Sequence, residues 1–167
     1  MTRTSPHRIL GIDPGLQTTG YGVIDLRGQD IAVVEAGILQ TDGKASLAER
    51  ITQLHADLVN LLAQTRPDQA AVEKLYAHYA HPTTAILMGH ARGVILLACA
   101  EAGVEVRDLP ATMIKRSVTG NGHASKQQVQ RAVRTVCGLR EIPEPPDVAD
   151  ALAIALCASR QASDPVA

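Results

Sequence analysis

Aromatic side chains are nearly absent from this sequence. Its 167 residues include no Trp, no Phe and only three Tyr, although 46% of the residues are hydrophobic. That hydrophobic content is typical of a globular protein and excludes a disordered one. The core must therefore consist of Leu, Ile, Val and Ala, and the chain is long enough for one domain that buries them. We expect this domain to cover residues 1–160, followed by a flexible tail at residues 161–167.

Cysteine is also scarce, which argues against a disulfide framework and a zinc site. Cys99, Cys137 and Cys157 are odd in number, widely spaced and outside any CxxC pattern. We interpret them as small apolar residues of a protein in the reducing cytoplasm. No apolar run approaches transmembrane length and no signal-peptide pattern is found, so no membrane association is expected.

Acidic residues are missing from one long stretch, residues 109–140. The rest of the chain has ten basic and seventeen acidic residues. The net charge of −1 argues against a general nucleic-acid binder, but this asymmetry favours one basic face for a polyanion. The alternative is a helix with a solvated basic side. The stretch contains six basic residues: Lys115, Arg116, Lys126, Arg131, Arg134 and Arg140.

The stretch that organises the chain is residues 8–25, which predicts a β-hairpin. An apolar run at residues 9–12 indicates a buried strand, Pro14 and Gly15 indicate a tight turn, and a second strand starts at Tyr21. Asp13 ends the first strand beside buried residues, where an uncompensated charge costs several kcal/mol. Asp13 either bonds the amides of its own turn or holds a metal ion, and this stretch alone leaves both open.

The rest of the chain alternates strand and helix patterns. Because a strand, a crossover helix and another strand favour parallel pairing, the first and fourth strands should be neighbours. Glu73, at the end of the fourth strand, should then lie close to Asp13. The patterns predict strands at 31–40, 69–73 and 104–109, and helices at 46–64, 83–102, 110–118, 125–136 and 147–157.

The helix predicted at residues 147–157 is apolar nearly all round, so it should be buried. Asp147 and Asp150 lie on one face of its first turn, where acidic residues also compensate the helix dipole. Together with Asp13 and Glu73 they form a set of carboxylates at element ends. Such a set would repel itself unless it were protonated or neutralised by cations. Oxygen ligands suit Mg²⁺ or Mn²⁺, and two such ions would support phosphodiester hydrolysis.

Five segments, taken together, resemble the RuvC-type Holliday-junction resolvases, and the match covers nearly the whole chain. This resemblance implies an α/β, RNase H-like fold with a five-stranded mixed sheet and helices on both faces. It implies a Mg²⁺-dependent homodimer that nicks opposing strands of a four-way DNA junction in recombination and repair. It also implies cooperation with the RuvAB branch-migration helicase complex. The segments are residues 9–15, 19–23, 71–73, 89–93 and 147–153.

The resemblance also assigns the candidate acidic residues. Asp13, Glu73, Asp147 and Asp150 fall on the catalytic, metal-binding positions of the family, with two ions expected per site. At the position of Asp147 some members have His, which leaves open whether Asp147 or Asp150 is the principal ligand.

Four further residues are expected to bind DNA. Tyr76 falls where the family has an aromatic residue that stacks on a base near the crossover, and its alternative is a half-buried loop anchor. Lys115 and Lys126 fall on basic positions that touch the scissile strand. Arg92 either contacts a backbone phosphate or forms a structural ion pair.

Several readings remain open at this point. The helix predicted at residues 83–102 is rich in small and apolar residues, so it packs either against a twofold mate or under the sheet. An actin-like phosphotransferase is disfavoured because 167 residues are too few for two such domains. A nuclease of the same fold that processes structured RNA is a closer alternative. A non-catalytic binding module is disfavoured by the intact acidic set.

Overall fold

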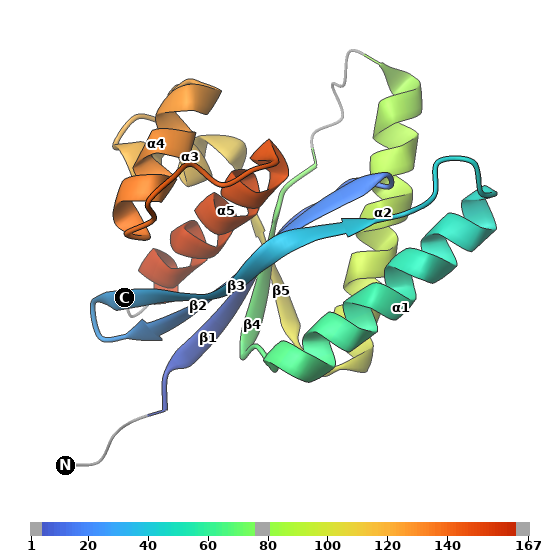
Figure 1. Cartoon of the computed structure of the whole chain (residues 1–167), viewed down its shortest axis with the longest axis horizontal. Helices are drawn as coiled ribbons and strands as arrows, with labels where there is room; N and C mark the ends of the chain where they lie inside the picture. Colours follow the sequence, from blue (N-terminus) through green and yellow to red (C-terminus); the bar gives the residue numbers. More distant parts are fainter. Residues whose placement is uncertain (1–4, 76–80, 163–167) are drawn as a thin grey trace.

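The fold is built around one mixed β-sheet. The computed structural model describes residues 5–75 and 81–162 of the chain. Five strands lie in the spatial order β3-β2-β1-β4-β5, which confirms the predicted five-stranded α/β architecture (Figure 1). Pairing is antiparallel along β3-β2-β1 and parallel along β1-β4-β5. The strands are β1 His7–Asp13, β2 Thr18–Arg27, β3 Asp30–Gln40, β4 Gln69–Glu73 and β5 Glu105–Leu109.

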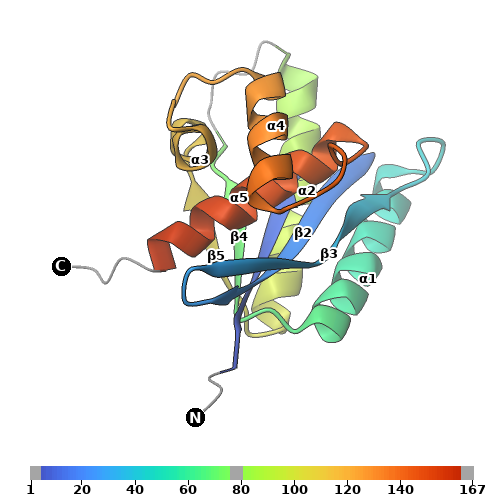
Figure 2. The same cartoon turned by 60° about the vertical axis from the view of Figure 1, so that its left-hand side comes forward.

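Helices cover both faces of this sheet, as Figures 1 and 2 show. The helices α1 (Leu47–Thr65) and α2 (Pro82–Glu101) pack on one face. The helices α3 (Ala111–Thr119), α4 (Lys126–Val136) and α5 (Pro146–Ala162) pack on the other. Each face has its own cluster of buried aliphatic side chains, so the core has two halves separated by the sheet.

Local capping signals explain why α1 and α4 begin near their predicted positions. Ser46 and Ser125 each accept a hydrogen bond from the backbone three residues later, in complete capping boxes before α1 and α4. The end of α5 was predicted at residue 157, but the helix continues to Ala162. The prediction was too short because burial continues beyond residue 157: Ala158 and Ser159 are at most 1% exposed.

The pairing of β1 with β4 brings two distant acidic positions to one end of the sheet. The strands are parallel, and their last paired residues are Ile12 and Val72. Asp13 and Glu73 directly follow this pair, although sixty positions separate them in the sequence. The prediction that the first and fourth strands are neighbours in the sheet is therefore confirmed.

Glycines in β1 and β2 let α5 lie directly on the sheet. A Cβ atom on Gly11 would overlap the backbone oxygen of Ala151, and one on Gly20 would overlap the backbone oxygen of Asp147. Gly20 pairs with Asp13 in the β1–β2 ladder. The close approach at Gly20 therefore places the first turn of α5 beside the end of β1.

The helix α2 is long and apolar enough to cross a membrane by length and composition alone. The sequence analysis found no uninterrupted apolar run of this length, and α2 passes the test only as a whole helix, because Gly, His and Arg residues interrupt its apolar side chains. Ala91, Ile95, Ala98 and Cys99 are buried against the rest of the protein. Its other face leaves large apolar side chains exposed: Ile86, Leu87, Leu96 and Leu97.

Candidate active site

Four carboxylates converge on the end of β1. Asp13 ends this strand, Glu73 ends β4, and Asp147 and Asp150 lie in the first turn of α5. The pKa of Asp13 is raised to about 7, first by burial and then by the charges of Asp150, Asp147 and Glu73, in that order of size. All three other acids therefore act electrostatically on Asp13, as an acidic cluster should.

Two lysines offset part of this negative charge. Burial is the largest cause that raises the pKa of Glu73, followed by Asp150, whereas Lys115 lowers it. Burial likewise raises the pKa of Asp150, and Lys126 opposes this shift through a contact of 3.3 Å between Nζ and Oδ2. Two lysines thus act on a cluster of four acids, so they offset only part of its negative charge.

The chemistry of these donors fits a hard divalent cation. The cluster offers only carboxylate oxygens, which suit Mg²⁺ or Mn²⁺ better than Zn²⁺. A bound cation would also relieve the repulsion that raises the pKa of Asp13. Within the described residues, however, no three Asp, Glu, His or Cys side chains already form a metal-binding group. Asp150 instead makes its contact with Lys126.

A pocket of about 290 Å³ adjoins the acidic cluster between α3, α4 and α5. Glu73, Asp150, Lys115 and Lys126 contribute its charged lining, and the remaining walls are aliphatic. The pocket thus combines two acids with the two lysines that were expected to touch the scissile strand. A larger cavity of about 500 Å³ between α1 and α2 is lined by none of the four acids, so its size does not make it the reaction site.

The predicted DNA-contact residues differ in their surroundings. Tyr76 lies outside the described residues. Lys115 is half-buried in α3, and Lys126 is exposed at the start of α4. Arg92 already has two protein partners: its Nη2 pairs with the carboxylate of Asp108, and its Nη1 donates to the backbone oxygen of Glu73 at 3.1 Å.

Asp108 is a residue that the sequence analysis did not single out. The only signal for it was a charged residue inside the short strand at 104–109. Its significance depends on β4–β5 pairing, which places Asp108 opposite Val72, next to the strand end that carries Glu73.

The five-stranded mixed sheet with helices on both faces defines an RNase H-like fold, and the acidic cluster lies at one end of its sheet. Residues 9–158 match the family model described as crossover junction endodeoxyribonuclease RuvC. The chain therefore belongs to the RuvC family, whose members are metal-dependent nucleases.

Individual relatives agree with this assignment. The chain is 49% identical to RuvC of Rhodopirellula baltica over 158 residues, which cover 95% of this chain and 89% of that protein. It is 46% identical to RuvC of Heliobacterium modesticaldum, over 89% of this chain and 91% of that protein. Both alignments span nearly the full length of each partner, so the similarity includes the whole domain.

Solved structures extend the comparison to three dimensions. Thermus thermophilus RuvC in complex with a Holliday junction substrate is similar with a TM-score of 0.89 and 35% identity, covering 94% of this chain and 95% of that one. The yeast mitochondrial Holliday junction resolvase has a TM-score of 0.69 at 15% identity, over 97% of this chain and 82% of that one. The latter likeness concerns the fold alone.

Proposed function

We propose that this protein is an endonuclease that resolves four-way DNA junctions by nicking two opposing strands symmetrically, in homologous recombination and repair. The observation that carries this proposal is the convergence of three further carboxylates on Asp13, which is half-buried at the end of β1. A basic segment at residues 109–140 contributes two lysines to the pocket beside these acids. A similar RuvC protein was solved with a Holliday junction substrate, which supports the same substrate class here.

The cofactor that we propose is Mg²⁺, for which Mn²⁺ would substitute, with two ions per site. Asp13, Glu73, Asp147 and Asp150 would hold them. When bound, the cations would supply an activated water and stabilise the leaving oxygen in phosphodiester hydrolysis.

The chain's own groups account for the pH dependence that we expect. Cation binding requires deprotonated carboxylates, and the pKa of Asp13 is about 7. Protons therefore compete with cations at Asp13, and the cation concentration needed for half-maximal cleavage should fall as the pH rises through about 7. Cleavage assays over a range of Mg²⁺ concentrations and pH values measure this; a requirement independent of pH would contradict it.

For the DNA, we propose that Lys115 and Lys126 contact the scissile strand at the pocket, and that Tyr76 stacks on a base near the crossover. Lysine contacts to phosphate should make junction binding strongly dependent on salt. Lys126 both lines the pocket and contacts Asp150 at 3.3 Å, so a strand bound at Lys126 would lie close to the acidic cluster.

Paired nicking of two strands requires two active sites, and we propose that a homodimer provides them through the exposed face of α2. Ile86 is 62% exposed and Leu97 is 53% exposed. Leu97 follows Ile86 by eleven residues, which corresponds to about three helical turns and places both on one side of α2. Light scattering should show a dimer at micromolar concentration, and Leu97→Asp should shift it toward monomer. We further propose a cytoplasmic location and cooperation with RuvAB.

One assay tests the proposed function directly. The purified protein is incubated with a mobile four-way junction, a linear duplex or an RNA hairpin, each with and without Mg²⁺. We expect symmetric nicks in the junction, only with Mg²⁺, and an intact duplex and hairpin. Preferential cutting of the hairpin would instead favour a nuclease that processes structured RNA.

A further inference from the structure

Arg92 is the only Lys or Arg residue in helix α2, most of whose side chains are apolar. Its side chain is only 11% exposed, whereas that of its ion-pair partner Asp108 is 49% exposed. The guanidinium is thus largely withdrawn from solvent, and two of its nitrogens already face protein oxygens. A positive charge in this position is better placed to organise the protein than to collect a phosphate from solvent.

The hydrogen bond that Arg92 donates to β4 lies where the pairing between β1 and β4 ends. On the β1 side, the last pair is Ile12 with Val72, so Glu73 lies one residue past the ladder. On the β5 side, the pairing continues through Glu73 and Leu109, and the backbone N–H of Lys74 donates to the oxygen of Leu109 at 2.8 Å. The backbone oxygen of Glu73 accepts from Arg92 at 3.1 Å, so the guanidinium continues the hydrogen bonding beyond the β1 ladder.

We propose that Arg92, held by Asp108, is a positioning residue that fixes the backbone of Glu73 and thereby the direction in which its carboxylate leaves β4. The inference rests on the function proposed above, because it concerns the same acidic site. The pair links three elements, α2, β4 and β5, at the strand end that carries a candidate cation ligand. It also joins the site to the helix whose opposite face remains apolar and exposed.

The competing role is a direct contact between Arg92 and a DNA phosphate. The two roles differ in what Asp108 does. If Arg92 bound phosphate, neutralising Asp108 would free the guanidinium and strengthen DNA binding. If Arg92 positions Glu73, neutralising Asp108 loosens the guanidinium and weakens the cation site, while the affinity for DNA changes little.

The test compares Arg92→Gln, Arg92→Lys and Asp108→Asn with the wild-type protein and with Arg27→Gln. The last variant is a matched control because Arg27 is an exposed arginine at the end of β2, outside the site. Three quantities are measured: junction affinity in EDTA, cleavage rate against Mg²⁺ concentration at saturating junction, and the shift in melting temperature that Mg²⁺ causes without DNA. The Mg²⁺-induced shift in melting temperature does not depend on activity. The melting temperature measured in EDTA reports whether each variant folds.

For Arg92→Gln we expect junction affinity within about twofold of wild type, since the residue is not the phosphate contact. Loss of a group that orients a metal ligand typically costs about 10–100-fold in metal affinity or activity, so the half-saturating Mg²⁺ concentration should rise and the thermal shift shrink. Asp108→Asn should act in the same direction with a smaller effect, and Arg92→Lys should recover part of the loss. Arg27→Gln should match wild type.

Two results would overturn the proposal. Weakened junction binding with an unchanged Mg²⁺ response in Arg92→Gln, together with tighter binding in Asp108→Asn, would make Arg92 a phosphate contact. An unchanged Mg²⁺ response in Asp108→Asn and Arg92→Lys would remove the positioning role even if Arg92→Gln failed to fold. If Mg²⁺ raised the melting temperature of the wild-type protein but the protein cut no junction, the proposed function would be contradicted. The positioning role would then still be tested by the Mg²⁺-induced melting shifts of the variants.

Discussion

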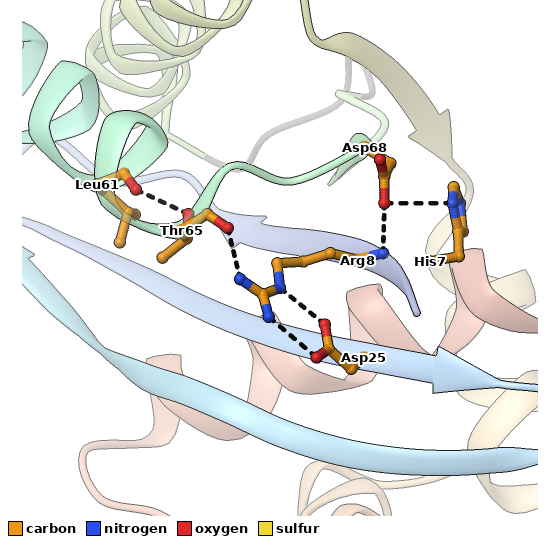
Figure 3. Close-up of polar contacts among 6 residues, drawn as sticks. All are labelled: His7, Arg8, Asp25, Leu61, Thr65 and Asp68. Atoms are coloured by element: carbon orange, nitrogen blue, oxygen red, sulfur yellow. Dashed lines mark hydrogen bonds and ion pairs between the residues drawn. The ribbon is translucent and has the colours of Figure 1, made fainter. Parts of the chain in front are cut away.

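The charged groups at the two ends of β1 differ: they are paired with opposite charges at one end and surrounded by like charges at the other. At the first end, Arg8 has partners for every part of its guanidinium (Figure 3): Nε and Nη2 donate to the Asp25 carboxylate at 2.7 and 2.9 Å, and Nη1 donates to the backbone oxygen of Thr65 at 2.8 Å. The bond with Arg8 is the largest cause that lowers the pKa of Asp25. At the other end, burial and three like charges raise the pKa of Asp13 to about 7.

The difference indicates that the Arg8 end of β1 stabilises the fold, and it fits our proposal that the Asp13 end binds cations. Arg8 joins β1 to β2 and to the last turn of α1, where a positive charge also suits the helix dipole. Among the residues that the structure describes, Lys126 is the positive group that lowers the pKa of Asp13, and it only partly offsets the neighbouring acids. Uncompensated charge of this kind persists in proteins where function requires it, at the expense of stability.

The largest expected effect comes from Asp13→Asn, which removes the charge at the centre of the cluster. Cleavage of junctions should be abolished, because cation binding loses its central carboxylate, whereas junction binding should remain. Gel assays of cutting and binding on the same DNA measure both. If the variant cut junctions normally in Mg²⁺, Asp13 would have no catalytic role.

The same variant should also be more stable than wild type without cations. The pKa of Asp13 is about 7 in the folded protein and lies near about 4 in an unfolded chain, so the folded state binds more protons between these values. The free energy of unfolding of wild type therefore falls as the pH rises through this window. Urea denaturation in EDTA at about pH 5 and about pH 8 should show a smaller fall for Asp13→Asn; an equal fall in both proteins would contradict the assignment.

The second effect concerns the close approach of α5. Gly20→Ala would place a methyl group against the backbone of Asp147 and push the first turn of α5 away from Asp13. Because displacement of a reacting group by about 1 Å can cost about 10²-fold in rate, we expect a cleavage loss of that order. Gly43→Ala is the control, since a Cβ there meets no atom closer than 4.0 Å. Equal cleavage rates for the two variants would show that α5 accommodates the methyl group.

These glycines show what sequence reasoning could and could not supply. Strand and helix patterns were enough to bring Glu73 beside Asp13, because a strand–helix–strand unit has few allowed topologies. Spacing was enough to place Asp147 and Asp150 on one face of α5. The roles of Gly20 and Asp108 depend on which backbone atoms meet across separate elements, and periodicity within one element carries no information about that.

The third effect tests the compensated end of β1. Arg8→Ala leaves the largely buried carboxylate of Asp25 and the Thr65 oxygen without their partner, which should lower the free energy of unfolding by about 2–3 kcal/mol. Cleavage at a temperature well below the melting point should be unchanged. Urea denaturation with Arg27→Ala as control measures the loss, and a loss no larger than that of the control would contradict the structural role of Arg8.

The stabilisation from the Arg8–Asp25 pair depends on pH in the opposite direction to the contribution of Asp13. The pKa of Asp25 is lowered in the folded protein, mainly by its bond with Arg8. The stabilisation is therefore present above the unfolded pKa of about 4 and is lost as the pH falls through the lowered folded value. Wild type should lose this stability in acid, whereas Arg8→Ala, which lacks the pair, should show a weaker acid dependence.

The smallest expected effect comes from Arg66, which follows Thr65 beside the Arg8 end of β1. Arg66 caps α1 in the left-handed conformation, with φ of 47°, where a side chain costs about 1–2 kcal/mol relative to Gly. The greater entropy of Gly in the unfolded chain offsets part of this, so Arg66→Gly should raise the free energy of unfolding by about 0.5 kcal/mol. If the two ends of β1 are independent, this gain and that of Asp13→Asn should add within about 0.5 kcal/mol in the double variant. A larger coupling would show that the stabilising end and the acidic end of the strand are energetically connected.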